Sequence, residues 1–326
     1  MSNLTSNDTS PPSNLTSLTP KSTETALCGV IVLLCLVGLV GNTIVIFYFW
    51  FRIKLSQSTV YILNLAVADF LFSVGCAIFF LYLACAMNGV PTTSESKRGI
   101  SIFGELLISL TFTASLFFLA TLSCERCLSV CFPLWYKCRR PAHLSTVLSG
   151  VMWILSLLIS ILERLVIPEH RSTVYIVTSA VFLLVTLLMV ASSVVLLIQI
   201  QKSSVECRPL KLYIVVVAAI VNYLISLAPS RVLRMVYFFA VVPTAYMRLI
   251  SIIVIFLCSA FNSAANPYIY IIVGRWKRRI STAQALKLAF QEDSNQTSEE
   301  NITMGSQQTE TEDKSEAVEI DGDKTL

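Results

Sequence analysis

Charged side chains are scarce in this sequence. Only 13% of the 326 residues are Asp, Glu, Lys or Arg, whereas a soluble globular domain carries about 25%. Apolar residues make up 55% of the chain, and the mean hydropathy is +0.72. This balance excludes an ordinary soluble enzyme and indicates apolar runs that are solvated by lipid.

Histidine is also rare, with two residues in the chain. His143 and His170 lie on opposite sides of the membrane in the topology that the apolar runs predict. No nucleophile stands beside a base, and the sequence has no metal-ligand spacing. We therefore expect no enzymatic activity and no catalytic cofactor. The net charge of +4 is too small to indicate a nucleic-acid partner.

Cysteine is plentiful, with ten residues, but the residues are not placed as a disulfide framework. Most lie inside apolar runs or beside basic residues, away from the oxidising outer surface where disulfides form. Only Cys85 lies close to the predicted outer surface, with Cys28 as its one candidate partner. We expect mostly free thiols, and whether Cys28 and Cys85 pair stays open.

Seven apolar runs are long enough to cross a bilayer, which takes about 20 residues in a helix. They cover residues 27–51, 59–86, 100–130, 146–167, 173–200, 212–240 and 246–273. The sequence therefore predicts an all-α membrane protein, a seven-transmembrane helix bundle over residues 27–273. The second half does not repeat the first, and the polar residues inside the spans gather at one depth, so a transporter is the weaker alternative.

Lys and Arg residues distinguish the two sides of the membrane. The connectors rich in them are residues 52–58, 131–145 and 201–211, together with the start of the tail. Because basic loops stay in the cytoplasm, we expect a multi-pass plasma-membrane protein with an extracellular N-terminus and a cytosolic C-terminus.

Residues 1–26 are rich in Ser, Thr and Pro and have no apolar core. Three acceptor sequons lie there, at Asn3, Asn7 and Asn14. This segment is predicted to be a glycosylated, disordered, extracellular N-terminus.

Two segments follow the last span. Residues 274–290 combine basic residues with Trp276 and Leu286, a pattern typical of a short amphipathic eighth helix on the lipid of the inner leaflet. Residues 291–326 are acidic and rich in Ser and Thr, which predicts a disordered cytosolic tail. This tail is either merely solvated or a phosphorylated docking segment.

One carboxylate lies inside a span. Asp69 belongs to the second apolar run, where a charge costs several kcal/mol unless it is protonated or paired. Asn42, Ser115, Asn262 and Asn266 are predicted at the same depth. Carboxylate, hydroxyl and amide oxygens suit a hard cation such as sodium, and the alternative is a neutral Asp69 hydrogen-bonded at a helix interface.

A second charged pair, Glu125 and Arg126, stands at the cytosolic end of the third span. Adjacent opposite charges can neutralise each other while buried, and chemistry alone leaves open an interfacial anchor or a switch. Pro229 and Pro267 lie inside the sixth and seventh spans, where a proline frees a backbone carbonyl and permits a kink.

Taken in this order, the motifs resemble class A (rhodopsin-like) G-protein-coupled receptors over about residues 27–290. The matching residues are Gly41 and Asn42, residues 65–69, residues 125–127, Trp153, Pro229 and residues 266–270. The sequence is further similar to the Mas-related branch of that class. This second similarity lies in residues 125–130, Pro133, Trp135, Tyr136, Cys138, and residues 139–141, 211–215 and 263–267.

The resemblance implies a receptor that binds an extracellular ligand and catalyses nucleotide exchange on a heterotrimeric G protein. It implies that Arg126, beside Glu125, engages the C-terminal helix of the G protein. The residues implied to rearrange on activation are Asn266, Pro267 and Tyr270. The residues implied to form a sodium site are Asp69, Ser115, Asn262 and Asn266. A phosphorylated tail would have arrestin as its partner.

The sequence departs from the class in several places. Ser101 stands where the third span usually begins with a disulfide cysteine, and Leu227 replaces the tryptophan expected two residues before Pro229. The fifth span lacks proline, and the start of the sixth has Lys211 in place of an acid. These departures keep a non-signalling or scaffold receptor open as the alternative. An opsin is excluded because the seventh span contains no lysine.

Charged residues also mark the outer ends of the spans. Glu105 and Glu163 lie at the tops of the third and fourth, and Arg231, Arg234 and Tyr237 lie above the proline of the sixth. By resemblance, Glu163 contacts the cation of basic ligands. The set predicts a ligand with both a cation and an anion, either a small peptide or a zwitterionic small molecule. The alternative is that these acids and arginines pair in the empty pocket.

Overall fold

The computed structural model describes residues 21–52, 58–89, 93–141, 143–165, 170–202, 210–239, 245–275, 281–282 and 284–286. The helices of these residues are α1 (Lys21–Arg52), α2 (Thr59–Met87), α3 (Ser94–Cys131), α4 (Pro133–Cys138), α5 (Leu144–Leu165), α6 (Arg171–Lys202), α7 (Leu210–Phe239) and α8 (Ala245–Arg275). Seven of them are long and apolar enough to cross a membrane. The predicted all-α seven-helix bundle is confirmed.

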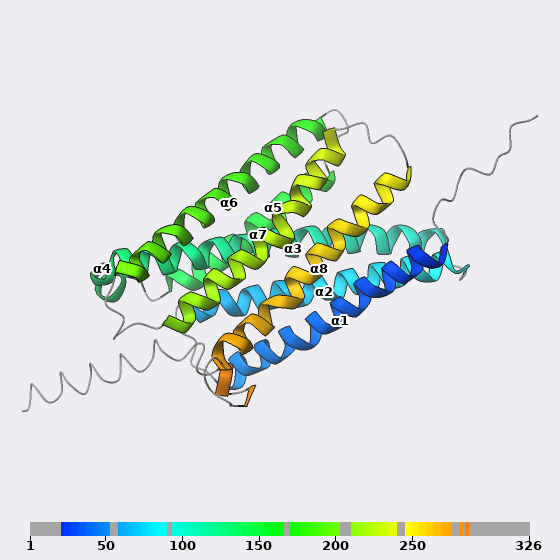
Figure 1. The fold of residues 1–326 in the computed structure, drawn as a ribbon. Helices are drawn as coiled ribbons and strands as arrows, with labels where there is room; N and C mark the ends of the chain where they lie inside the picture. Colours follow the sequence, from blue (N-terminus) through cyan, green and yellow to red (C-terminus); the bar gives the residue numbers. More distant parts are fainter. Residues whose placement is uncertain are drawn as a thin grey trace, which may run out of the picture.

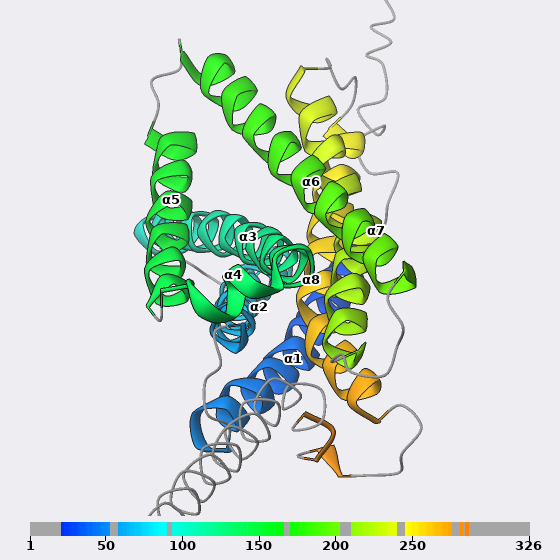
Figure 2. The same cartoon turned by 90° about the vertical axis from the view of Figure 1, so that its left-hand side faces the viewer.

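The long helices pack around α3 (Figures 1 and 2). Helix α3 contacts α2, α5, α6 and α7, while α8 contacts α1, α2 and α7. Short α4 follows α3 directly and turns the chain toward α5. The strongest contacts of α7 are with α8, and the two helices run side by side in both views. Any movement of α7 would therefore change its contact with α8.

Helix α5 buries polar side chains and exposes apolar ones, the opposite of a helix in a soluble protein. Its buried residues are Ser145, Ser149, Ser156 and Ser160, whereas leucines such as Leu158 and Leu162 are about half exposed, toward lipid. Serines at this spacing form one face, and small side chains let membrane helices approach closely. On the same face, Trp153 Nε1 donates to Asn64 Oδ1 of α2 at 2.9 Å.

Two glycines permit close packing of α8. A Cβ atom at Gly41 of α1 would lie 2.6 Å from Cγ of Pro267, so α1 approaches α8 at a point where only glycine fits. A Cβ atom at Gly274 would overlap the carbonyl group of Ala285. The chain beyond α8 therefore folds back directly onto the end of that helix.

The predicted amphipathic eighth helix, residues 274–290, lies mostly outside the described residues. In the described part, Ser281 Oγ accepts from the Gln284 amide at 3.3 Å, and Gln284 Oε1 accepts from the Ser281 amide at 3.2 Å. This reciprocal pair is a capping box, which marks a helix start. Leu286 is 1% exposed and belongs to the main core.

The remaining predictions concern the N-terminal sequons, the C-terminal tail and the cysteine thiols. The sequons at Asn3, Asn7 and Asn14 and the tail 291–326 lie outside the described residues. Every cysteine in the described ranges is a free thiol, including Cys28 and Cys85.

Candidate functional site

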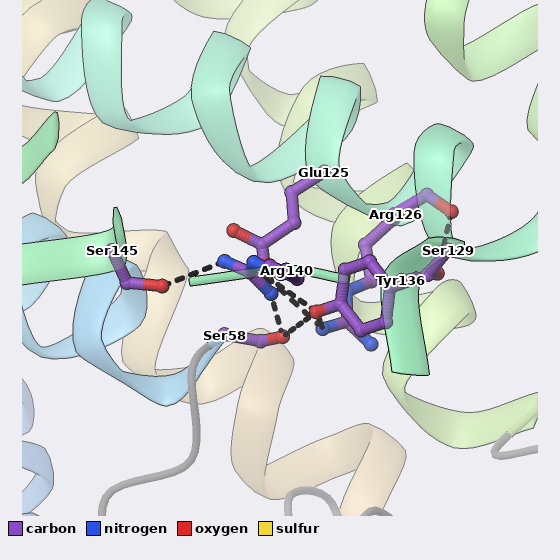
Figure 3. A network of polar contacts seen from close by, with 7 residues as sticks. All are labelled: Ser58, Glu125, Arg126, Ser129, Tyr136, Arg140 and Ser145. Carbon is purple, nitrogen blue, oxygen red and sulfur yellow. Dashed lines mark hydrogen bonds and ion pairs between the residues drawn. The ribbon is translucent and has the colours of Figure 1, made fainter. Parts of the chain in front are cut away.

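A buried polar network lies at the C-terminal end of α3 (Figure 3). Glu125 and Arg126 are 6% and 2% exposed, and Arg126 Nη2 lies 3.6 Å from Glu125 Oε1. The same Oε1 accepts hydrogen bonds from Ser58 Oγ at 3.0 Å, Tyr136 OH at 2.7 Å and Arg140 Nη1 at 3.0 Å. One carboxylate therefore joins α3 to α4, to the segment after α4 and to the start of α2.

Tyr136 of α4 bridges the two charges. Its hydroxyl donates to Glu125 and lies 3.3 Å from Arg126 Nη2, which donates to it. Burial raises the pKa of Tyr136 above its usual value, with a smaller opposing effect from the charge of Arg126. The phenol therefore keeps its proton at neutral pH and remains a donor to Glu125.

Arg140 is the second cation of this network. Its Nη2 donates to Ser145 Oγ of α5 at 2.7 Å, and its guanidinium carbon lies 4.6 Å from the centre of the Tyr136 ring, a cation–π distance. Sequence reasoning gave roles to Glu125 and Arg126 but none to Ser58, Tyr136 or Arg140. The signal available was the basic run after α4, which the orientation argument used only as a count of charges.

A second polar site lies in the middle of the bundle around Asp69, which is 1% exposed. Ser115 Oγ donates to Asp69 Oδ1 at 2.9 Å, and Asn266 Nδ2 donates to Asp69 Oδ2 at 2.7 Å. Ser263 Oγ donates to the Asp69 carbonyl at 2.9 Å. The site thus joins α2, α3 and α8 through one carboxylate.

Three of the four residues predicted for sodium are in direct contact, and the fourth, Asn262, is linked to Asn266 through Asn222. Asp69, Ser115 and Asn266 are in contact, whereas Asn262 Oδ1 accepts from Asn222 Nδ2 at 3.0 Å and from Ser226 Oγ at 3.3 Å, both on α7. Sequence reasoning missed Asn222, although an amide inside an apolar span is a visible signal.

The donor set around Asp69 fits a small hard cation. It consists of the Asp69 carboxylate and the hydroxyl oxygens of Ser115 and Ser263, which are ligands that such cations prefer, whereas Asn266 turns its amide nitrogen to Asp69 and its oxygen to Asn222. Each Asp69 oxygen accepts one of the two side-chain hydrogen bonds, and a carboxylate oxygen has room for more than one partner. Asp69 and Ser115 would hold such an ion directly, and Asn266 would join them by turning its amide oxygen toward it.

The remaining residues predicted for activation lie in α8. Tyr270 is 1% exposed and belongs to the main core, and Pro267 packs on Gly41 of α1. Asn266 lies one turn before Tyr270, between the Asp69 carboxylate and Asn222, whose Nδ2 is 3.4 Å from Asn266 Oδ1. Asn266 is therefore shared between the Asp69 site and α7.

Two acids predicted at the outer end lie between α3 and α5. Glu105 forms an ion pair with Arg164 and accepts from Ser101 Oγ at 2.9 Å. Glu163 Oε2 accepts from Ser109 Oγ at 3.3 Å. The structure thus gives Glu105 a cationic partner from α5, whereas the contact of Glu163 is with a neutral hydroxyl.

The other residues predicted for ligand binding are in α7. Arg231, Arg234 and Tyr237 belong to that helix, but their side chains lie outside the described part of the structure. The alternative that Arg231 or Arg234 pairs with Glu105 or Glu163 therefore also lies outside the described residues.

A seven-helix membrane bundle with a buried Glu-Arg pair at the C-terminal end of α3 and a carboxylate at its centre defines a class of receptor. The family described as 7 transmembrane receptor (rhodopsin family) matches residues 41–270. The relatives agree. Mas-related G-protein coupled receptor member X1 of Homo sapiens is 35% identical over 298 residues, 85% of this chain and 88% of the relative.

Two further relatives give the same result. Mas-related G-protein coupled receptor member X2 of Macaca mulatta is 33% identical over 274 residues, covering 80% of each chain. The mouse protein Proto-oncogene Mas is 32% identical over 252 residues, 74% of this chain and 75% of the relative. The chain therefore belongs to the Mas-related branch of the rhodopsin family of seven-transmembrane receptors.

Membership of this family fixes the general function. The chain is a multi-pass plasma-membrane receptor that couples an extracellular ligand to a G protein, and it is a signalling receptor and not an enzyme.

Proposed function

We propose that the network around Glu125 is the switch through which this receptor engages its heterotrimeric G protein. Arg126 is almost completely buried and is held by Glu125 and Tyr136. A G protein that binds Arg126 must draw its guanidinium away from these two partners. The exchange is local, because Glu125 lies on α3 and Tyr136 on α4 (Figure 3).

The observation that carries this proposal is the second cation on Glu125. Removing one partner of a buried ion pair costs about 3–5 kcal/mol when the other charge is left uncompensated. Arg140 Nη1, at 3.0 Å, keeps Glu125 paired after Arg126 leaves. The network can therefore release Arg126 at a much lower cost than an isolated Glu-Arg pair.

On the outer side, the proposed ligand is a small peptide or zwitterionic molecule whose cation binds Glu163. Glu105 is already neutralised by Arg164, so Glu163 is the better anchor of the two. Arg231, Arg234 and Tyr237 are proposed to bind the anionic and apolar parts of the ligand, from their sequence positions on α7.

The proposed sodium ion would be held by Asp69, Ser115 and Asn266, with Asn262 completing the predicted set. The ion would supply positive charge that compensates the Asp69 carboxylate inside the membrane. Its bound state would favour the arrangement in which these α2, α3 and α8 residues lie together.

The orientation and the remaining partners are also proposals. The N-terminus is proposed to be extracellular and glycosylated, and the C-terminus cytosolic, on the distribution of Lys and Arg. Arrestin at the Ser/Thr-rich tail and inner-leaflet lipid at residues 274–290 are proposed from composition.

The function is tested by measuring activation of the four Gα families in cells that express the receptor. Cells are exposed to peptides that carry a cation alone, an anion alone or both. Activation by the peptides with both charges supports the proposal. No activation by any peptide, with normal surface expression and no basal signal, would favour the non-signalling receptor.

A further inference from the structure

Polar side chains of α7 form hydrogen bonds with α8 in the middle of the membrane-spanning bundle. Asn222 Nδ2 lies 3.0 Å from Asn262 Oδ1, 3.3 Å from the Asn262 carbonyl and 3.4 Å from Asn266 Oδ1. Ser226 Oγ, one turn further along, lies 3.3 Å from Asn262 Oδ1. The two acceptor residues on α8 are each 1% exposed, so water does not compete for these hydrogen bonds.

Asn222 lies between Pro229 and the N-terminal end of α7, so a small displacement at Asn222 corresponds to a larger one at that end. Pro229 lies inside α7 and has no amide hydrogen, so the helix lacks one backbone hydrogen bond there. At 1.5 Å per residue, Ser226 lies about 4.5 Å from Pro229, Asn222 about 10 Å and Leu210 about 28 Å. A tilt about Pro229 that moves Asn222 by about 1 Å therefore moves the cytosolic end of α7 by about 3 Å.

The N-terminal half of α7 packs against the part of α3 that follows Arg126. Tyr213 of α7 packs with Val130 of α3 and Leu196 of α6 in a buried cluster. Val130 lies one helical turn after Arg126. Outward tilting of α7 would break this cluster and open the side of α3 next to Arg126.

We propose that Asn222 is a latch that holds α7 closed against α8 and so keeps Arg126 covered. It is a positioning residue, because it acts through Asn262 and Asn266 and does not touch the G protein. The inference rests on the proposed function only for its link to signalling, because the closing of α7 is a structural event in its own right.

The size of the effect follows from hydrogen bonds between membrane helices. Measured couplings of this kind correspond to factors of about 3 to 20 in an equilibrium. Removing the Asn222 amide should raise the ratio of open to closed α7 by such a factor. Ser226 lies closer to Pro229 and moves less, so its removal should have a smaller effect.

The test compares Asn222→Leu with Asn64→Leu in the full-length receptor in nanodiscs. Asn64→Leu is the matched control, because it also removes one interhelical hydrogen bond, from Trp153 of α5, but on α2 and not on α7. Spin labels on unnatural amino acids at Lys211 of α7 and Phe51 of α1 report the distance between cytosolic helix ends. Basal nucleotide exchange on purified G protein is measured in parallel. If Asn222→Leu does not yield folded receptor, Asn222→Ala replaces it.

The expected result is a longer distance population in Asn222→Leu, about 3 to 20 times more occupied than in wild type, and an unchanged distribution in Asn64→Leu. In Asn262→Leu the further change Asn222→Leu should have a smaller effect than in wild type, because the nearest acceptor is gone and only the longer contacts to the Asn262 carbonyl and to Asn266 remain. A distance distribution in Asn222→Leu equal to that of wild type would overturn the latch. A shifted distribution without any G-protein activation would keep the latch and contradict the proposed function.

Discussion

Arg140 Nη1 lies 3.0 Å from Glu125 Oε1, so the acid at the end of α3 is bound by an arginine from beyond α4. The neighbouring Arg126 is farther from the same oxygen, at 3.6 Å. The sequence has Lys211 at the start of the sixth span in place of an acid. The described network instead supplies a hydroxyl from Tyr136 to Arg126 and a second cation to Glu125.

Replacing this second cation should weaken signalling. In Arg140→Gln, Glu125 depends on Arg126 alone, and release of Arg126 would leave a buried carboxylate without a cation. A charged hydrogen bond is worth about 1.5–3 kcal/mol, so we expect ligand-stimulated nucleotide exchange to fall about tenfold or more. The matched control is Arg139→Gln, because Arg139 is adjacent and exposed. Higher exchange in Arg140→Gln than in Arg139→Gln would show that Arg140 holds the network closed.

The outer acids should differ in their effect on ligand binding. Glu163→Gln removes the proposed anchor of the ligand cation and should lower the potency of a cationic peptide about 10-fold to 100-fold. Glu105→Gln should have a smaller effect because Arg164 already neutralises that acid. Glu95, exposed in the first turn of α3, provides the control variant Glu95→Gln. Equal losses from Glu105→Gln and Glu163→Gln would contradict the assignment.

The central carboxylate should make receptor stability depend on sodium. A ligand that binds only the folded state raises its stability in proportion to the logarithm of its concentration once the site is filled. Replacing choline chloride by sodium chloride at constant ionic strength should therefore raise the Tm of wild-type receptor in detergent. Asp69→Asn should lose this dependence. A sodium-dependent Tm that persists in Asp69→Asn would place the ion elsewhere.

The close contact between α1 and α8 predicts a strong effect of one methyl group. Gly41→Ala would place a Cβ atom against Pro267 and should destabilise the receptor by about 1–3 kcal/mol. Gly29→Ala, in the same helix, meets no atom within 4 Å and is the matched control. Thermal unfolding of both variants in detergent decides the point, since equal Tm values would mean that the contact is not tight.

The sequence predicted the seven spans and the residues Asp69, Glu125 and Arg126 because these signals are local. An apolar run of about 20 residues needs no partner to be recognised as a membrane span. A charge inside or at the end of such a run is rare enough to mark a site. The buried serine face of α5 could also have been read from its spacing.

The partners of these residues could not be predicted, because they depend on how each helix is rotated and tilted. The pairing of Arg140 with Glu125 requires α4 to turn back beneath α3. Asn262 lies one turn before Asn266 on the same face of α8, yet its side chain contacts Asn222 on α7 whereas Asn266 reaches Asp69 on α2. Glu105 of α3 pairs with Arg164 of α5, a contact that depends on how these two helices pack.

The central claim is that Arg126, released from Glu125 and Tyr136, engages the G protein. It is tested most directly by nucleotide exchange on purified G proteins of the four Gα families, with receptor reconstituted in nanodiscs. Wild type is compared with Arg126→Ala and with Arg139→Ala, at equal amounts of folded receptor. We predict that exchange by wild type and by Arg139→Ala is similar for at least one family and that Arg126→Ala abolishes it. Full exchange by Arg126→Ala would contradict the account.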